Sequence, residues 1–354
     1  MTTTTGMPVL QVSDLRVTYY TDAGRTRAVD GVNLTLYAGE RLGLVGESGC
    51  GKSTMALALM RMIKPPGRIE TGSVLVGPAG DQVDTLKLTE QQMLQARLSR
   101  IAYIPQGAMN SLNPVMKIQS QMIDAMRAHN VKGDHDELVR RAEVALESVE
   151  LRRTVMRMYP HELSGGMKQR VCIAISILLS PKVIIADEPT SALDVVVQRQ
   201  VMETICRVQE KLGAAVILIG HDMGLMAQIT NRVAVMYAGK LVELSTVREM
   251  FTNPLHPYAQ ALISSLPNLE NKGVFQSIPG LAPSLLRLPN GCTFHPRCKY
   301  AMDVCKTLAP PQSVTPSGRY VFCHLYDREG NRVQQPAVAG NGNAPHQKVP
   351  VAEN

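Results

Sequence analysis

A glycine-rich stretch near residue 50 carries the clearest chemistry in the chain. Residues 46–53 read Gly-Glu-Ser-Gly-Cys-Gly-Lys-Ser, which matches the phosphate-loop pattern G-x-x-x-x-G-K-[ST]. Glycines let such a backbone curl so that its N–H groups point at phosphate oxygens, and the helix predicted to follow adds the positive end of its dipole. Lys52 would neutralise the β- and γ-phosphates of a nucleotide, and the Ser53 hydroxyl would hold Mg²⁺.

Two acidic residues end an apolar segment further along the chain, where residues 183–186 are followed by Asp187 and Glu188. A carboxylate at the carboxyl end of a parallel strand lies where phosphate-bound Mg²⁺ is found, so Asp187 is expected to contact the metal through water. Glu188 would face the γ-phosphate and orient the attacking water. Two acids after a strand usually cap a helix, but the phosphate loop in the same chain favours the metal role.

A second anion-binding helix start is predicted at residues 163–170, Leu-Ser-Gly-Gly-Met-Lys-Gln-Arg. A serine and two glycines open an apolar helix there, and helix N-termini attract anions. One chain needs only one such device for one triphosphate. The pair therefore predicts a dimer in which this turn of one chain closes on the nucleotide held by the other; an N-capped helix with a glycine hinge would explain the helix start alone.

With these motifs in this order, residues 9 to about 250 resemble the ABC ATPase family. Residues 46–54 resemble its Walker A motif, residues 183–188 its Walker B motif and residues 163–170 its signature motif. The remaining motifs that resemble the family are Gln106 (Q-loop), Ser191-Ala192-Leu193-Asp194 (D-loop) and His221 (switch histidine).

The resemblance implies a role for each of these residues. Gln106 would contact Mg²⁺ and the lytic water, and His221 would hold the γ-phosphate and Glu188 in place. Ser164 and Gly166 would bind the γ-phosphate of the partner chain's ATP, with Asp194 across the dimer interface.

An aromatic side chain is expected to stack on adenine, and the resemblance favours Tyr19, with Tyr20 as the alternative. The residues assigned to ATP are Tyr19, Gly46, Glu47, Ser48, Gly49, Cys50, Gly51, Lys52, Ser53, Thr54, Ser164, Gly165, Gly166 and Asp194. The expected catalytic residues are Glu188, His221, Gln106 and Lys52, and the expected Mg²⁺ ligands are Ser53, Gln106 and Asp187.

Four of the seven cysteines crowd into one C-terminal stretch: Cys292, Cys298, Cys305 and Cys323. In a reducing cytoplasm such a cluster favours a metal site over two disulfides. The spacing is unlike the tight cysteine pairs of a zinc ribbon, whereas four thiolates can hold a [4Fe–4S] cluster.

The same region resembles the C-terminal extension of the oligopeptide/dipeptide importer ATPase subunits, through His256-Pro257-Tyr258, Pro279-Gly280 and residues 292–298. Some members of that group carry an iron–sulfur cluster. The expected group is therefore a [4Fe–4S] cluster, with Zn²⁺ or no metal as alternatives, and with His295 and His324 as substitute ligands.

One segment departs from the peptide-importer pattern. Residues 107–114 read Gly-Ala-Met-Asn-Ser-Leu-Asn-Pro, where many peptide importers have an acidic residue and a proline directly after the glutamine. Related importers of oligosaccharides or nickel share the architecture, so both solutes stay open beside peptides.

The elements that must position these residues follow an α/β pattern. Alternating apolar residues predict strands over 9–20 and 28–37, with a turn at residues 22–24. A strand over 41–45, a helix over 52–62 stopped by Pro65-Pro66-Gly67, and an amphipathic helix over 134–150 come next. Continuous apolar runs predict buried parallel strands at 183–186 and 215–219.

The expected fold class is therefore α/β, a P-loop NTPase with a RecA-like core, an antiparallel β subdomain and a helical signature subdomain, plus a small loop-rich C-terminal domain with the cysteines. The expected divisions are a disordered start at 1–8, a nucleotide-binding domain at 9–265 with its helical subdomain at 106–170, the C-terminal domain at 266–330 and a disordered tail at 331–354.

Composition limits the function classes. The chain has 354 residues, a net charge of +7 without any long basic run, and no apolar stretch of about 20 residues that could cross a bilayer. No signal peptide is recognisable, so a cytoplasmic protein is expected. A DNA-repair ABC ATPase would need a long coiled coil, a translation ABC ATPase two cassettes, and an iron–sulfur DNA regulator a basic recognition helix; the sequence has none of these.

The predicted function is thus the ATP-hydrolysing, energy-coupling subunit of an importer, at the cytoplasmic face of the inner membrane. Its expected partners are two transmembrane permease subunits, a second copy or a sister ATPase, and an extracytoplasmic solute-binding protein, with no nucleic acid.

Overall fold

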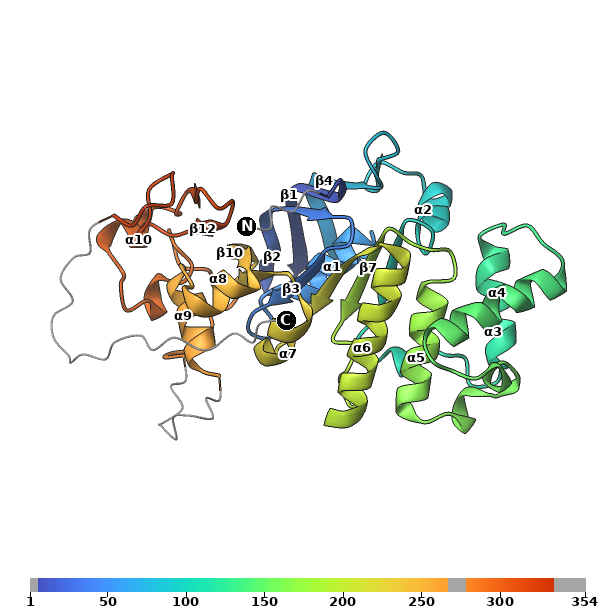
Figure 1. Cartoon of the computed structure of the whole chain (residues 1–354). Helices are drawn as coiled ribbons and strands as arrows, with labels where there is room; N and C mark the ends of the chain where they lie inside the picture. The colour runs from blue at the N-terminus through green and yellow to red at the C-terminus, as the bar shows by residue number, and fades with distance from the viewer. Residues whose placement is uncertain (1–5, 267–277, 334–354) are drawn as a thin grey trace.

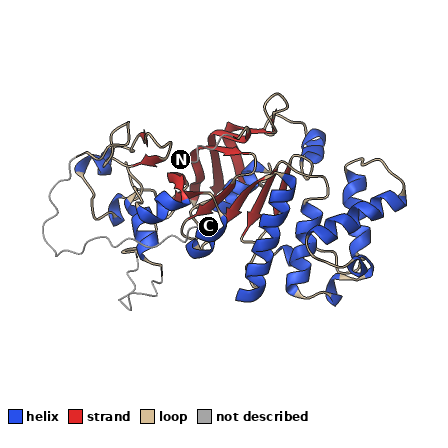
Figure 2. Cartoon of the chain, viewed as in Figure 1, coloured by secondary structure: helices blue, strands red, loops and turns tan. Residues whose placement is uncertain are grey.

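The structure, a computed structural model, describes residues 6–266 and 278–333. Within these residues the chain forms two β-sheets with helices around them (Figures 1 and 2). The sheets lie in the middle of the view in Figure 1, between a helical group that contains α3, α4 and α5 on one side and a C-terminal lobe that contains α9, α10 and β12 on the other.

The smaller sheet is antiparallel and has the order β2-β1-β4-β5 in the described part of the chain. Its strands are β1 Pro8–Thr21, β2 Gly24–Tyr37, β4 Gly67–Val76 and β5 Val83–Asp84. Thr21 pairs with Gly24, so the predicted turn is a two-residue hairpin loop. The two predicted strands and their turn are confirmed, with each strand slightly longer than the apolar alternation indicated.

The larger sheet has the order β11-β12-β10-β9-β3-β8-β7-β6 among the described residues. Its strands are β3 Arg41–Val45, β6 Ile101–Ile104, β7 Val183–Asp187, β8 Ala215–Ile219, β9 Arg232–Tyr237, β10 Lys240–Thr246, β11 Gln312–Val314 and β12 Tyr320–Phe322. The strands from β9 to β6 run parallel, whereas β10, β12 and β11 extend one edge in antiparallel pairs. The buried parallel strands predicted from continuous apolar runs are confirmed.

The register of the parallel strands fixes where the candidate residues lie. Leu44 pairs with Ile219, Asp187 pairs with Ile219, and Ile104 pairs with Ala186. The carboxyl ends of β3, β8, β7 and β6 therefore meet at one edge, where ligands bind in open α/β sheets. The segments that leave this edge carry the phosphate loop, His221, Glu188 and Gln106.

The helices pack around this frame. Their bounds are α1 Lys52–Leu59, α2 Glu90–Ala96, α3 Ile118–Ala128, α4 His135–Ser148, α5 Gly165–Ser176, α6 Val195–Leu212, α7 Met223–Ile229, α8 Val247–Thr252, α9 Pro257–Ser264 and α10 Asp303–Thr307, with 3₁₀ turns η1 Ala108–Asn110, η2 Arg153–Arg157, η3 Pro160–Glu162 and η4 His295–Arg297.

Two helices bear on the predictions. The amphipathic pattern of α4 is confirmed: Asp134 caps it by accepting from the Glu137 N–H, and its apolar side, which includes Leu138 and Ala142, is buried. Helix α1 is shorter than predicted and ends at Leu59 instead of Met62. Arg61 adopts a left-handed conformation (φ 48°), and its guanidinium binds the Leu88 carbonyl and Glu90, which breaks the helix before the prolines.

The C-terminal lobe is joined to the larger sheet. Strand β12 pairs with β10, and the buried carboxylate of Glu243 on β10 accepts from the Arg319 guanidinium at 2.9 Å. The Leu255 and His256 N–H groups donate to the same carboxylate at 3.0 and 2.7 Å. These contacts satisfy a charge that would otherwise be costly to bury.

The predicted boundary near residue 265 adjoins residues 267–277, which lie outside the described part of the chain, as do residues 1–5 and 334–354. Two residues at the inner edges of the predicted disordered ends take part in strand pairing. Pro8 begins β1, and Arg332 forms an isolated β-bridge with Tyr326. None of the helices in residues 6–266 and 278–333 combines the length and apolarity needed to span a membrane.

Candidate nucleotide site

The phosphate loop between β3 and α1 has the conformation that its glycines permit. Gly46, Gly49 and Gly51 have φ of 151°, 76° and 109°. A Cβ atom at Gly46 would lie 2.1 Å from the Met236 carbonyl oxygen, so a side chain does not fit there. Gly51 is the N-cap of α1 and supplies no side-chain cap, which leaves the first N–H groups of the helix available to an anion.

Lys52 lies folded inside this loop. It is only 7% exposed, and its Nζ donates to the carbonyl oxygens of Gly46 at 2.7 Å and Glu47 at 3.0 Å. The ammonium therefore sits on the inner side of the curl, where it can meet phosphate oxygens that enter the loop.

Asp187 closes the site from the end of β7. It is 1% exposed; its Oδ2 accepts from the Tyr103 hydroxyl at 3.1 Å, and its Oδ1 is buried without a hydrogen-bond partner in the part of the chain described. Burial raises the pKa of the Asp187 carboxyl, which hydrogen bonds from Ser53 and Tyr103 partly oppose. A carboxylate oxygen without a partner beside a serine hydroxyl is a donor set that fits Mg²⁺.

Glu188 stands between Gln106 and His221. The Gln106 Nε2 donates to Glu188 Oε2 at 2.7 Å, and the His221 Nδ1 lies 3.6 Å from Glu188 Oε1. The Glu188 side chain is 23% exposed and that of His221 78% exposed, so solvent reaches both. Glu188 has φ 45°, a strained left-handed conformation, while its N–H donates to the Ile219 carbonyl oxygen at 3.0 Å. The three predicted residues converge on one point.

The predicted signature and D-loop residues meet at the starts of α5 and α6. Ser164 caps α5 by accepting from the Met167 N–H at 3.3 Å, and Asp194 caps α6 by accepting from the Val197 N–H at 3.0 Å. A Cβ atom at Gly166 would lie 2.5 Å from a Val197 methyl group, so close packing of α5 on α6 also requires glycine there.

The two candidate aromatic residues differ in their surroundings. Tyr19 is half-buried, and its Cε1 would lie 2.6 Å from a Cβ atom at Gly67, so its ring lies against that glycine. Tyr20 is exposed; its hydroxyl donates to Glu70 at 2.8 Å, and the guanidinium groups of Arg25 and Arg68 lie near its ring.

Two contacts of the site were not predicted. Tyr103 stands on β6, three residues before Gln106, and its hydroxyl donates to Asp187 at the end of the neighbouring strand β7. The parallel pairing of β6 with β7 was the missing information. The Glu47 carboxylate binds Arg297, 250 residues away, and the contact of Glu47 with ATP stays a prediction.

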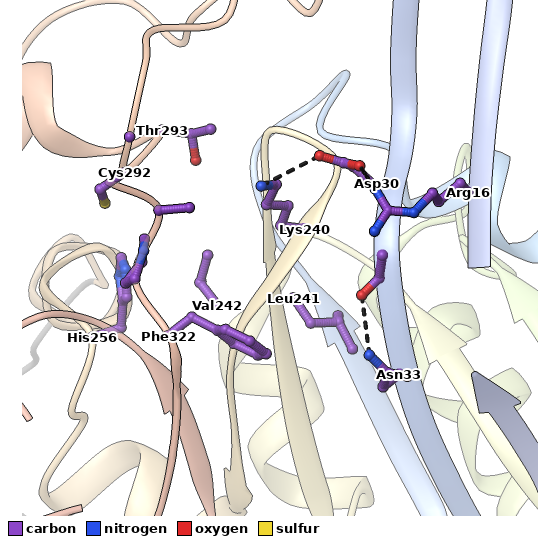
Figure 3. A pocket seen from close by; sticks show the side chains of 14 residues that line it. Arg16, Asp30, Asn33, Lys240, Leu241, Val242, His256, Cys292, Thr293 and Phe322 are labelled. Atoms are coloured by element: carbon purple, nitrogen blue, oxygen red, sulfur yellow. Dashed lines mark hydrogen bonds and ion pairs between the residues drawn. The ribbon is translucent and has the colours of Figure 1, made fainter. Parts of the chain in front are cut away.

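The four C-terminal cysteines are free thiols in one lobe, and Cys292 lines a cavity of about 190 Å³ beside Lys240, His256 and Phe322 (Figure 3). Burial, together with the nearby thiols of the other three cysteines, raises the pKa of Cys323 to about 12. Nevertheless, in residues 6–266 and 278–333 no three His, Cys, Asp or Glu side chains form a group that could hold a metal.

One ring nitrogen of each predicted substitute ligand contacts a backbone carbonyl oxygen. The His295 ring contacts the Cys292 carbonyl oxygen at 2.9 Å, and the His324 ring contacts that of Leu308 at 2.9 Å. Four thiols are therefore chemically suited to bind an iron–sulfur cluster. In the described residues, however, their positions are not those of four ligands around one metal centre.

Comparison with known proteins agrees with this geometry. Residues 29–191 match the ABC transporter family, and residues 242–305 match the C-terminal region of the oligopeptide/dipeptide transporter family. The chain is 43% identical to the oligopeptide transport ATP-binding protein OppD of Salmonella typhimurium over 324 residues, 89% of this chain and 93% of that protein. It is 40% identical to the dipeptide transport ATP-binding protein DppD of Caldanaerobacter subterraneus subsp. tengcongensis, over 90% of this chain and 97% of that protein.

A solved structure extends the likeness to the fold. The dimeric ATP-binding cassette MJ0796 in a post-hydrolysis state, bound to ADP and Pi, is 25% identical with a TM-score of 0.59, over 68% of this chain and 99% of that one. The expected fold class is confirmed. The chain therefore belongs to the ABC transporter family, in the group of oligopeptide and dipeptide transport ATP-binding proteins, and is an ATPase that couples hydrolysis to import.

Proposed function

We propose that this ATPase powers the import of oligopeptides or dipeptides, and that it does so by clamping ATP and Mg²⁺ between two protomers. The names of its relatives support peptide as the solute. Oligosaccharide and nickel importers remain the alternative, because residues 107–114 depart from the peptide-importer pattern. Transport assays with radiolabelled peptide, oligosaccharide and Ni²⁺ in proteoliposomes would separate them.

Hydrolysis is assigned to Glu188 and its two neighbours. Glu188 accepts the proton of the attacking water, while Gln106 and His221 hold one carboxylate oxygen each in position. Lys52 and the N–H groups of the phosphate loop bind the β- and γ-phosphates. Ser53, Asp187 and Gln106 hold Mg²⁺, which when bound supplies charge neutralisation for the phosphates.

Across the dimer, Ser164, Gly165 and Gly166 bind the γ-phosphate held by the partner, and Asp194 lies at the interface. Their support is the start of α5, where Ser164 is the N-cap, and the start of α6 beside it, where Asp194 is the N-cap. The partner is a second copy or a sister ATPase. Tyr19 stacks on adenine; Tyr20 is the less favoured alternative, because arginine side chains and Glu70 already occupy its surroundings.

The helical subdomain that follows Gln106 contacts one of two permease subunits. The protein therefore lies peripherally at the cytoplasmic face of the membrane. A solute-binding protein delivers the solute to the permease on the other side of the membrane. Closure of the clamp pushes on the permease, and hydrolysis reopens it. Photo-crosslinking from exposed Val115, just after the Q-loop turn, tests this contact; crosslinks to permease are expected, and crosslinks confined to the other ATPase would contradict it.

The observation that carries the ATPase mechanism is the convergence of Gln106, Glu188 and His221 beside the phosphate loop. Its test is Glu188→Gln, which keeps the shape and the bond to Gln106 but removes the base. Hydrolysis is expected to fall about a hundredfold or more while ATP binding remains. Normal turnover in this variant would count against the mechanism.

We further propose that the four C-terminal cysteines take up a [4Fe–4S] cluster, with Zn²⁺ as the alternative. The gathering of four thiols in one lobe supports this, and ligation requires their sulfurs to converge on one centre. Anaerobically purified protein is expected to be brown and to contain iron and sulfide, both lost in Cys298→Ser. A colourless preparation that contains zinc would overturn the iron assignment.

A further inference from the structure

The second residue of the phosphate loop is held from the C-terminal lobe. The Arg297 guanidinium donates to both carboxylate oxygens of Glu47, at 2.8 and 2.9 Å. The Arg297 side chain is 5% exposed. Such a two-point contact fixes both the position and the plane of the carboxylate.

Other groups of the same region hold Arg297 in place. Its Nε donates to the Pro279 carbonyl oxygen at 2.9 Å, and its guanidinium donates to the Tyr237 hydroxyl at 3.3 Å. It ends the short turn η4, which lies between Cys292 and Cys298. The arginine is thus built into the cysteine lobe.

The main chain of Glu47 is held from the same side. Its N–H donates to the hydroxyl of the buried Tyr258 on α9 at 2.8 Å. The Tyr258 ring packs on Tyr237 and Phe294 with centroid distances of 4.5 and 5.4 Å. The backbone and the side chain of this one loop residue are therefore bound by Tyr258 and Arg297, which lie 211 and 250 positions later in the chain.

The position of Glu47 gives this contact a consequence for nucleotide binding. The Glu47 carbonyl oxygen accepts from Lys52 Nζ at 3.0 Å, so the residue also helps to orient the phosphate-binding ammonium. A carboxylate in this loop would repel a polyphosphate unless its charge were neutralised. Arg297 supplies that positive charge and holds the loop in one conformation before the nucleotide arrives.

We propose that Arg297 is a positioning residue for the ATP site: through Glu47 it pre-forms the phosphate loop, so that the affinity for ATP depends on the C-terminal lobe. The proposal rests on the nucleotide site described above. It assigns the lobe a role at the phosphate loop that is separate from any metal the cysteines hold.

The test measures the Kd of a fluorescent ATP analogue together with KM and kcat for the full-length protein. Arg297→Ala is expected to raise Kd and KM about tenfold or more with kcat changed less than about twofold, because the loop must be ordered and the repulsion overcome on binding. Arg297→Lys is expected to recover part of the loss, since it restores the charge but not the two-point contact.

The double variant Glu47→Gln/Arg297→Ala separates charge from general damage. It is expected to bind ATP more tightly than Arg297→Ala alone, because the unpaired carboxylate is gone. Lys306→Ala removes an exposed ion pair with Asp303 in the same lobe and serves as the matched control, with Kd unchanged.

Three results would overturn the proposal: an unchanged Kd in Arg297→Ala, equal losses in both the single and the double variant, or a fall in kcat with KM unaffected. If Arg297→Ala does not fold, Arg297→Lys decides: a Kd raised threefold or more at an unchanged melting temperature supports the proposal, and an unchanged Kd overturns it. Wild-type protein that binds no nucleotide would instead refute the proposed function itself.

Discussion

Asp187 and Glu188 are adjacent acids with opposite surroundings. Asp187 is 1% exposed and its burial raises the pKa of its carboxyl, whereas the Glu188 carboxylate reaches solvent and accepts from Gln106. One is therefore suited to hold a metal that neutralises it, and the other to act on water. The hydrogen bond from the Tyr103 hydroxyl lowers the pKa of Asp187 and so opposes part of the effect of burial.

The variant Tyr103→Phe tests this adjustment. Loss of the hydroxyl raises the pKa of Asp187 further, so the carboxyl stays protonated to higher pH and competes less well for Mg²⁺. We expect the acid limb of the ATPase pH profile to move to higher pH, and the Mg²⁺ concentration for half-maximal rate to rise about fivefold, the value of one hydrogen bond of ~1 kcal/mol. A profile that superimposes on the wild type would show that Tyr103 has no such role.

At the scale of elements, the parallel register of β3, β8, β7 and β6 brings loops from distant parts of the chain to one edge. Three helices also begin with residues of the predicted nucleotide site. Helix α1 follows the phosphate loop, and α5 and α6 begin after Ser164 and Asp194, which are predicted to contact the partner's nucleotide and the dimer interface.

The start of another helix, α9, contains a buried histidine. His256 caps α9 through Nδ1, which accepts from the Tyr258 N–H at 3.0 Å, and burial lowers the pKa of His256 to about 3.

This cap predicts a pH-dependent stability. The unfolded chain protonates His256 near pH 6.5, whereas the folded chain does so only near pH 3. The contribution of neutral His256 to the free energy of unfolding is therefore complete above pH 6.5 and is lost as the pH falls toward 3. Between pH 8 and pH 5 the loss is about 2 kcal/mol. His256→Asn keeps a capping acceptor without a titrating group.

Thermal denaturation at the two pH values measures the effect. The melting temperature of the wild type is expected to fall more between pH 8 and pH 5 than that of His256→Asn. Equal falls in both proteins would show that His256 is not the group responsible.

Local patterns predicted much of the site. The phosphate loop, Asp187, Glu188, Gln106 and His221 belong to short segments whose spacing already indicates a strand, a turn and a chemistry, and the structure brings the last three together. The contacts that were missed, Tyr103 to Asp187 and Arg297 to Glu47, join residues 84 and 250 positions apart, and no local pattern records such pairing. The early end of α1 likewise depends on Arg61 bonding to Leu88 and Glu90.

At the scale of the whole molecule, the C-terminal lobe continues the nucleotide-binding sheet through β12 and β11 and contacts the phosphate loop through Arg297 and Tyr258 (Figure 1). The opposite side of the molecule carries the helical subdomain. The phosphate loop thus lies between a lobe that orders it and a subdomain proposed to push on the permease, and the proposed dimer closes over it.

The most direct test of that dimer measures ATP turnover per protomer over a hundredfold range of protein concentration, with mass determined by light scattering at each point. The nucleotide clamp predicts that turnover rises with concentration as dimers form, or that it appears only when a sister ATPase is added. Undiminished turnover in strictly monomeric protein at every dilution would contradict the account.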